Sequence, residues 1–504
     1  MIKASIVVLV ILLSAILLYI WFREYRKNKL QEVSILGHQK DSVFSGVTKE
    51  GLEVWLKTNQ RAMHTQVIGT TNAGKTESVI IPWAVQDIFN GRGILLIDGK
   101  ADNSLLNKLW SYSVKAGREK DFRLFSLSNL ELSHQFNPLI GGPSEEITER
   151  VFNSFEFENP HYRSLQYEVM IQVMRILEGA KIVPSFQRLY SLIEEPASLV
   201  PLALNTKDEQ LVKWATSFSK LERRDLENRT SGLLSALSHF SFGERAKLFN
   251  PKSDAITLDE AISKNQIVYF QLPVLLSPFL GKATGKMVLQ SLQAAVANRH
   301  RSGEIQNFFS VFLDDFSEYL YDGFVSILNK SRSANVGIVF AHQALGDIKA
   351  LGDATANSIL TNSNIKVFMR NNDPESAEYF AKTIGTVEGK KETLRQQSNL
   401  IGKSVTGDGS TREVEQYPYH PNKFKRDLGI GQAIMIIPHE KGAKTIEIKF
   451  NKIDDLPKIE MIKIHKEVLP PLETTQVKQI MNQPNENQPS SKPLYATFNQ
   501  QRGL

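Results

Sequence analysis

The chain of 504 residues contains no cysteine. Disulfide bonds and thiolate metal sites are therefore excluded, and folding needs no oxidising compartment. The ten histidines show no spacing typical of a metal site. The formal net charge is only +6, which permits nucleic acid or an anionic membrane surface as a partner but requires neither.

Long apolar runs are also scarce, and a single stretch, residues 4–22, is suited to crossing a membrane. As a helix it would span about 28 Å, close to the thickness of a bilayer core. Aromatic and then basic residues follow its end: Tyr19, Trp21, Phe22, Arg23, Arg26, Lys27 and Lys29. This charge bias predicts a retained single-pass anchor with the bulk of the chain in the cytoplasm. A cleaved signal peptide is the alternative, although no small-residue cleavage site follows.

The pattern G-x-x-x-x-G-K-[ST] is complete at residues 69–76, which read Gly69, Thr70, Thr71, Asn72, Ala73, Gly74, Lys75 and Thr76. A short strand at residues 65–68 precedes it, and a helix start at residues 77–81 follows. The glycines let backbone N–H groups wrap phosphates, Lys75 reaches the terminal phosphates, and Thr76 can hold Mg²⁺. The pattern predicts ATP and Mg²⁺ as cofactors. A glycine-rich turn that binds nothing is the alternative.

Apolar strands alternate with helical segments along most of the body, which is typical of a parallel, doubly wound α/β sheet. Strands are expected at residues 43–47, 52–56, 65–68, 93–98, 122–127, 266–270, 308–313, 336–340, 365–369 and 433–437. From residue 143 to residue 249 the strand signals vanish and helical spacing replaces them, which predicts an inserted all-α domain. A polar stretch, residues 389–415, is expected to be a long loop.

We therefore expect four parts. Residues 1–29 form a transmembrane anchor, residues 30–142 and 250–465 a nucleotide-binding domain, and residues 143–249 the all-α insertion. Residues 466–504 are rich in Pro, Gln, Asn and Ser. They are expected to be disordered because they carry too little apolar surface to bury.

Three further positions carry candidate chemistry. The strand at residues 308–313 leads into Asp314 and Asp315, of which Asp314 would direct Mg²⁺ through water and Asp315 would orient the attacking water. Gln343 ends another strand, where a sensor of the terminal phosphate is expected, and Arg332 ends the helix before that strand. Each position also has an ordinary alternative interpretation. The two aspartates could cap the following helix, Gln343 could be a polar residue at a strand end, and Arg332 could be a solvated cation.

Together these features resemble the type IV coupling proteins, the membrane-anchored ATPases of bacterial conjugation and type IV secretion, which are relatives of FtsK-like DNA translocases. The resemblance covers about residues 60–450. It rests on the N-terminal anchor, the phosphate loop, the all-α insertion, the strands that lead to Asp314 and Gln343, and further segments: residues 94–102, 367–378, and 413–415 leading into 428–433.

The resemblance implies a RecA/FtsK-like P-loop fold and a homo-hexameric, ATP-driven motor at the bacterial inner membrane. Such a motor brings relaxase-bound single-stranded DNA to the channel proteins of a type IV secretion system. The resemblance also implies that Arg332 is an arginine finger, that Gln343 is a sensor, and that the all-α insertion receives the substrate complex.

The chain departs from the family at Asp315, where Asp-Glu is common, so Glu318 is a substitute candidate for the catalytic acid. It also has one predicted membrane span where many relatives have two. DNA contacts are expected from basic residues of the predicted loop, although a solvated loop is the alternative: Lys390, Lys391, Arg395, Lys403 and Arg412.

Three other functions remain open. One is an FtsK-like chromosome translocase, and another is an ATPase that powers assembly or protein export in the same secretion machines. The third is a membrane-tethered substrate receptor that binds nucleotide without moving DNA.

Overall fold

The computed structural model describes residues 14–21, 41–303, 307–399 and 402–470. The chain forms two compact units, one of residues 1–86 with 339–454 and one of residues 87–338 with 455–504. Residues 14–21 of the expected anchor are helical, and the rest of that segment lies outside the described residues. No helix within the described ranges is both long enough and apolar enough to span a bilayer. The predicted anchor therefore stays a prediction.

The first unit contains a mixed sheet in the order β2-β1-β15-β14-β11-β3-β10. The strands β10, β3 and β11 are parallel, and the others pair antiparallel. The bounds are β1 Ser42–Thr48, β2 Glu53–Lys57, β3 Thr65–Ile68, β10 Val336–His342, β11 Ile365–Met369, β14 Gln432–His439 and β15 Gly442–Phe450. The strands β3 and β11 match their predicted bounds, whereas β15 was not predicted.

Short helices complete this unit: α2 Thr58–Arg61, η1 Thr76–Ile80, α14 Leu345–Lys349, α15 Asp353–Asn362, α16 Pro374–Ile384 and η7 Lys423–Asp427, with α3 Ile81–Phe89 leading into the second unit. The helix α16 packs Ala377, Phe380 and Ala381 against apolar residues of β3, β11 and β14. The rings of Phe368 and Phe380 stack with centroids 4.3 Å apart. This core fixes the strand ends that lead into the phosphate loop.

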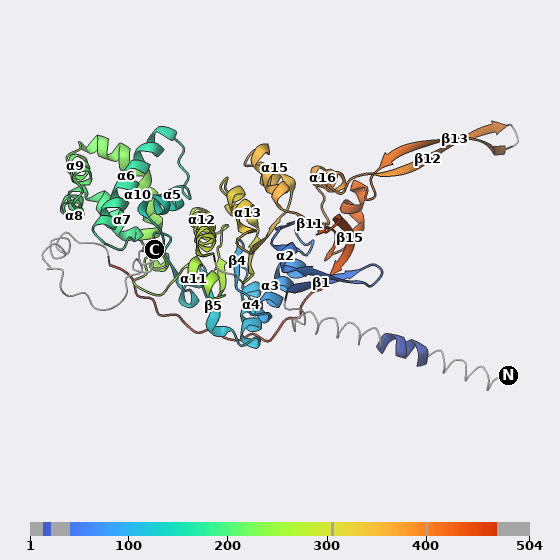
Figure 1. Cartoon of the computed structure of the whole chain (residues 1–504), viewed down its shortest axis with the longest axis horizontal. Coiled ribbons are helices and arrows are strands. Elements are labelled where there is room, and N and C mark those ends of the chain that lie inside the picture. Colours follow the sequence, from blue (N-terminus) through green and yellow to red (C-terminus); the bar gives the residue numbers. More distant parts are fainter. Residues whose placement is uncertain (1–13, 22–40, 304–306, 400–401, 471–504) are drawn as a thin grey trace. The chain divides into compact units, whose positions relative to one another are not determined.

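The prediction of a long loop at residues 389–415 is wrong. Two strands, β12 Val387–Asn399 and β13 Gly402–Gln416, run side by side as an antiparallel ribbon (Figure 1). Its register shifts between Leu394 and Gln396. The strands β12 and β13 pair only with each other and belong to no larger sheet. Their sequence therefore lacks the alternation of apolar and polar residues that predicts strands with one buried face.

The second unit contains a parallel sheet in the order β9-β4-β8-β5. The four strands are β4 Ile94–Asp98, β5 Phe122–Ser126, β8 Ile267–Gln271 and β9 Phe309–Asp314. All but Arg123 of β5 are buried, as expected for a parallel sheet covered on both faces. Helices connect the strands: α4 Asn103–Lys115, α11 Leu258–Ser263, α12 Pro278–Ser302, η6 Phe316–Tyr319 and α13 Phe324–Ser331.

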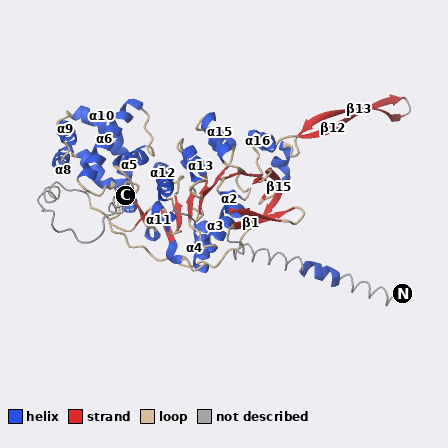
Figure 2. Ribbon diagram, in the orientation of Figure 1, coloured by secondary structure: helices blue, strands red, loops and turns tan. Residues whose placement is uncertain are grey.

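Between β6 Gln135–Phe136 and β7 Ala255–Ile256 the described elements are all helical (Figure 2). They are α5 Ser144–Phe152, α6 Pro160–Gly179, α7 Phe186–Glu194, η4 Pro196–Ser198, α8 Leu199–Thr206, α9 Glu209–Phe218, α10 Arg223–Ser241 and η5 Glu244–Leu248. The helix α10 packs against α6 and α7, and the buried rings of Phe186 and Phe240 stack at 4.6 Å. The predicted all-α character is present, while its status as a separate domain stays a prediction.

Residues 455–470 run without a helix along the second unit. The backbone of this segment is bonded at intervals: Ser111 donates to the Pro457 carbonyl, and the Leu469 amide donates to the Asn250 carbonyl. Residues 471–504 of the predicted tail lie outside the described residues.

Candidate functional site

The phosphate loop follows β3 directly and is held in shape by its glycines. Gly74 has φ 99°, and a Cβ there would lie 2.9 Å from the Ser78 hydroxyl. A Cβ on Gly69 would lie 2.8 Å from the Cβ of Met369. Both contacts are closer than a side chain tolerates, so the loop needs glycine at both positions. The cradle that they leave is the space in which backbone N–H groups approach a phosphate.

Lys75 is buried and folds back over the loop. Its Nζ donates to the carbonyls of Gly69 at 2.6 Å and Thr70 at 3.2 Å. The loop is itself tied to β11, because the Thr70 amide donates to the Arg370 carbonyl at 2.9 Å. A glycine cradle under a buried ammonium fits a nucleotide phosphate. Thr76, the predicted metal ligand, opens the π-helical turn η1 directly after Lys75.

Gln343 follows the last residue of β10, and the structure brings its side chain to the phosphate loop. The Thr71 hydroxyl donates to Gln343 Oε1 at 3.2 Å. The backbone of Gln343 is held from both sides, because its N–H donates to Asp347 at 2.8 Å and its carbonyl accepts from Asn371 at 2.7 Å. A side chain at this place can contact a ligand of the loop.

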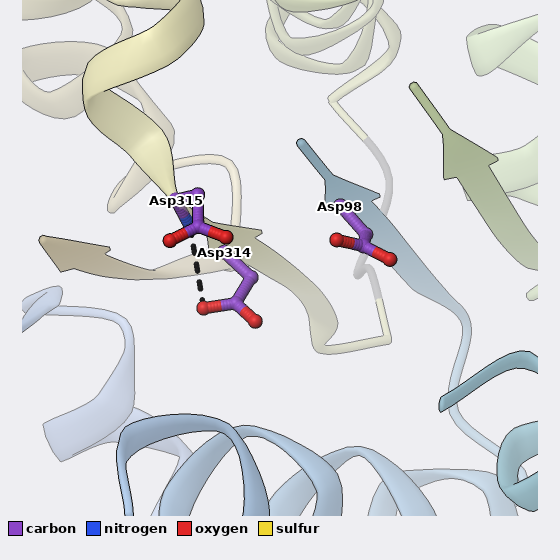
Figure 3. Close-up of side chains that lie close together, drawn as sticks. All are labelled: Asp98, Asp314 and Asp315. Carbon is purple, nitrogen blue, oxygen red and sulfur yellow. Dashed lines mark hydrogen bonds between the residues drawn. The ribbon is translucent and has the colours of Figure 1, made fainter. Parts of the chain in front are cut away.

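Three carboxylates meet in the second unit: Asp98 at the end of β4, Asp314 at the end of β9, and Asp315 (Figure 3). Their oxygens lie within 4.8 Å of one another, because β4 and β9 pair in parallel with Asp98 opposite Asp314. Asp315 has φ 48°, in the left-handed region. An oxygen set of this kind suits a hard divalent cation such as Mg²⁺.

Asp98 is the functional candidate that the sequence reasoning missed. Its carboxylate accepts from the backbone N–H groups of Lys100 and Asp102 and from the Tyr269 hydroxyl, each at 2.8 Å. Burial nevertheless raises the pKa of Asp98 above its ordinary value, and the charge of Asp315 adds to the rise. The position of Asp98 at the end of a predicted strand was a usable signal, because the carboxyl ends of parallel strands lie at the same edge of a sheet.

A lysine neutralises part of this negative charge. Lys100 Nζ lies 2.8 Å from Asp315 Oδ2. Burial lowers the pKa of Lys100, but the hydrogen bond and the charge of Asp315 outweigh it, so that the pKa lies above its ordinary value. Glu318, the substitute acid, is half exposed, and Lys282 Nζ lies 3.8 Å from it.

Arg332 and five basic residues are the remaining predicted site residues. Arg332 is exposed at the C-terminal end of α13. The five basic residues expected to touch DNA belong to β12 and β13, and their side chains lie outside the described part of the structure.

Comparison with known proteins finds sequence similarity to type IV coupling proteins. Residues 309–418 match the family described as "TraM recognition site of TraD and TraG". The chain is also similar to the type 4 coupling protein DotL of Legionella pneumophila, with 23% identity over 86% of this chain. It spans 65% of the length of that relative.

Solved structures show the same fold at low sequence identity. The bacterial conjugative coupling protein TrwB, in an unbound form, aligns with a TM-score of 0.59 and 12% identity over 86% of this chain and 93% of TrwB. VirB4 of Thermoanaerobacter pseudethanolicus aligns with a TM-score of 0.52 and 13% identity over 82% of this chain and 97% of VirB4. The α/β P-loop fold is therefore that of these proteins. The match at residues 309–418 and the DotL relative add sequence similarity to type IV coupling proteins.

Proposed function

We propose that the chain is an ATPase that couples a DNA or protein substrate to a type IV secretion channel. The observation that carries the proposal is the phosphate loop, with its glycine cradle and with Lys75 held over it. Structures of TrwB in complex with ADP and Mg²⁺ and with an ATP analogue support nucleotide as the ligand.

The proposed chemistry divides between the units. In the first unit Lys75 and the loop N–H groups bind the phosphates, and Gln343 contacts the terminal one. Thr76 is the predicted Mg²⁺ ligand of the first unit. In the second unit Asp314 is a predicted Mg²⁺ ligand, and Asp315 orients and deprotonates the attacking water. Mg²⁺, when bound, neutralises charge that develops on the phosphates.

The proposed assembly follows the family. The chain would act as a homo-hexamer at the bacterial inner membrane, anchored by residues 1–29. Its partners would be the relaxosome with single-stranded DNA and the channel proteins. The match to a TraM recognition site over residues 309–418 supports a relaxosome partner.

Arg332 gives a test of the assembly. Its exposed position at the end of α13 suits a guanidinium that reaches a neighbouring subunit's nucleotide. We expect Arg332→Ala to lower kcat by at least about 10³-fold, while nucleotide affinity stays unchanged. Loss of nucleotide binding instead would assign Arg332 a local structural role.

One observation favours a second candidate, the tethered substrate receptor. The ion pair between Lys100 and Asp315 occupies the carboxylate that the motor needs for water activation. A receptor would bind nucleotide through Lys75 but would not turn it over. In that case hydrolysis stays at background in the wild type and in Lys100→Met alike.

Steady-state ATP hydrolysis by the full chain separates the two candidates. The motor predicts turnover that Lys75→Ala abolishes, with Lys444→Ala as a control because Lys444 is an exposed lysine of β15. Nucleotide binding that depends on Lys75 without any turnover would favour the receptor.

A further inference from the structure

A histidine lies in the buried strand β10, where the neighbouring residues are apolar. His342 is 1% exposed, and burial lowers its pKa to about 4. Its ring is therefore neutral at physiological pH, with one nitrogen that donates and one that accepts. Which nitrogen carries the proton follows from its two neighbours.

His342 Nε2 lies 2.9 Å from the Gln66 amide nitrogen, and Nδ1 lies 2.8 Å from the Ala344 carbonyl oxygen. A carbonyl can only accept, so Nδ1 must donate to Ala344. Nε2 then accepts from the Gln66 NH₂ group, which can only donate. The two contacts agree on a single tautomer, and no other assignment satisfies both.

This chain of hydrogen bonds continues away from the phosphate loop. The Tyr379 hydroxyl donates to Gln66 Oε1 at 3.4 Å. Every donor therefore points the same way, from Tyr379 to Gln66, to His342 and to Ala344. Gln66 is fully buried on β3, so this series of hydrogen bonds runs through the core between α16 and the end of β10. In a medium of low dielectric such a chain is rigid, since leaving any member unpaired is costly.

This series of hydrogen bonds ends at Ala344, the residue after Gln343. His342 holds the Ala344 carbonyl, and Asp347 and Asn371 hold the backbone of Gln343. Asp347 also accepts from the Ala344 amide at 2.9 Å. The backbone at residues 343 and 344 is thus fixed by three side chains, while the Gln343 side chain meets Thr71 of the phosphate loop.

We infer that His342 is a positioning residue for Gln343. The neutral imidazole acts as a rigid spacer that sets the turn after β10 and so the place of the Gln343 amide at the phosphate loop. This inference rests on the proposed function, because a position for Gln343 matters only if it senses a bound phosphate. A histidine that merely satisfies core hydrogen bonds would need both of its contacts equally.

Two substitutions separate positioning from packing. The side-chain nitrogen of asparagine can occupy the place of Nδ1, so His342→Asn keeps the bond to Ala344 and loses the one to Gln66. The side-chain oxygen of glutamine can occupy the place of Nε2 and accept from the Gln66 NH₂ group, so His342→Gln keeps contact with Gln66 and loses the bond to Ala344. His439→Gln, at an exposed position at the end of β14, is the control.

We expect His342→Gln to lower kcat for ATP hydrolysis by about 10-fold or more, with KM changed less than about twofold, since a misplaced group slows chemistry more than binding. His342→Asn is expected to stay within about threefold of the wild type. Equal losses in both variants, or no loss in either, would overturn the inference.

Hydrogen exchange at the Gln343 amide tests the inference without activity. The amide donates to Asp347 in the folded chain, and it should exchange faster in His342→Gln than in His342→Asn without nucleotide present. Equal exchange in the two variants would contradict the positioning role. Absence of turnover in the wild type, with the exchange difference intact, would instead count against the proposed ATPase and leave the positioning of this turn supported.

Discussion

In the first unit a series of neutral side chains, Tyr379, Gln66 and His342, leads to the turn at Gln343 beside the phosphate loop, whereas in the second unit three carboxylates lie close together and one lysine pairs with Asp315. The neutral groups form directed bonds that hold Gln343 in place. The carboxylates repel one another, and the pKa of Asp98 rises as a result of burial and of Asp315. One region is rigid through satisfied hydrogen bonds, and the other holds a charge imbalance that a bound cation would relieve.

Of the two regions, the charged one is expected to show the larger effect on turnover. Asp315→Asn removes the carboxylate but tolerates the left-handed backbone at φ 48°, because asparagine adopts this region readily. We expect kcat for ATP hydrolysis to fall by about 100-fold or more, as on loss of a general base. Asp315→Glu gives the Asp-Glu pair that is common in type IV coupling proteins, and it should remain active.

Thermal melts of both variants serve as the control for folding. If Asp315→Asn hydrolyses ATP at the wild-type rate, Asp315 is not the catalytic acid, and Glu318 becomes the next residue to test.

The neutral region should respond to acid. His342 has a folded-state pKa of about 4 against 6.5, so the unfolded chain binds a proton first as the pH falls. The contribution of the neutral ring to the free energy of unfolding is fully present above about pH 6.5 and decreases as the pH falls from 6.5 to 4. Between pH 7 and pH 5 the loss is about 2 kcal/mol.

Urea unfolding across this range measures that loss. His342→Asn, which cannot titrate, should show a shallower dependence of unfolding free energy on pH than the wild type. Parallel curves would mean that the pKa of His342 is the same in the folded and the unfolded chain.

A matched pair of tyrosines compares the stability of the two regions directly. The buried Tyr269 donates to the Asp98 carboxyl group at 2.8 Å, while Tyr379 donates to the neutral amide of Gln66 at 3.4 Å. Hydrogen bonds to charged groups contribute more, so Tyr269→Phe should cost about 1.5–3 kcal/mol and Tyr379→Phe at most about 1 kcal/mol. Equal costs in urea unfolding would mean that Asp98 is protonated in the folded chain.

The phosphate loop, whose residues are consecutive in the sequence, was predictable. The carboxylate group, whose residues come from different strands, was predictable only in part. The phosphate loop is one run of residues, and β3 and β11 beside it match their predicted bounds. Asp314 was found because an apolar strand leads into it. Asp98 ends a strand in the same way, but its partnership with Asp314 depends on strand order, which the chain does not state.

Other misses have different causes. The alternation of Ile446, Ile448 and Phe450 with polar residues was a usable signal for β15. No such signal existed for the ribbon of β12 and β13. The bond from His342 to Gln66 joins residues 276 positions apart, and local pattern carries no information about such a contact.

We propose that this chain is a motor that couples ATP hydrolysis to the movement of a substrate. The most direct measurement is ATP hydrolysis by the full chain with and without single-stranded DNA, beside Lys75→Ala. The account predicts hydrolysis that single-stranded DNA stimulates and that the Lys75 variant lacks. Nucleotide binding with no hydrolysis, with or without DNA, would contradict it.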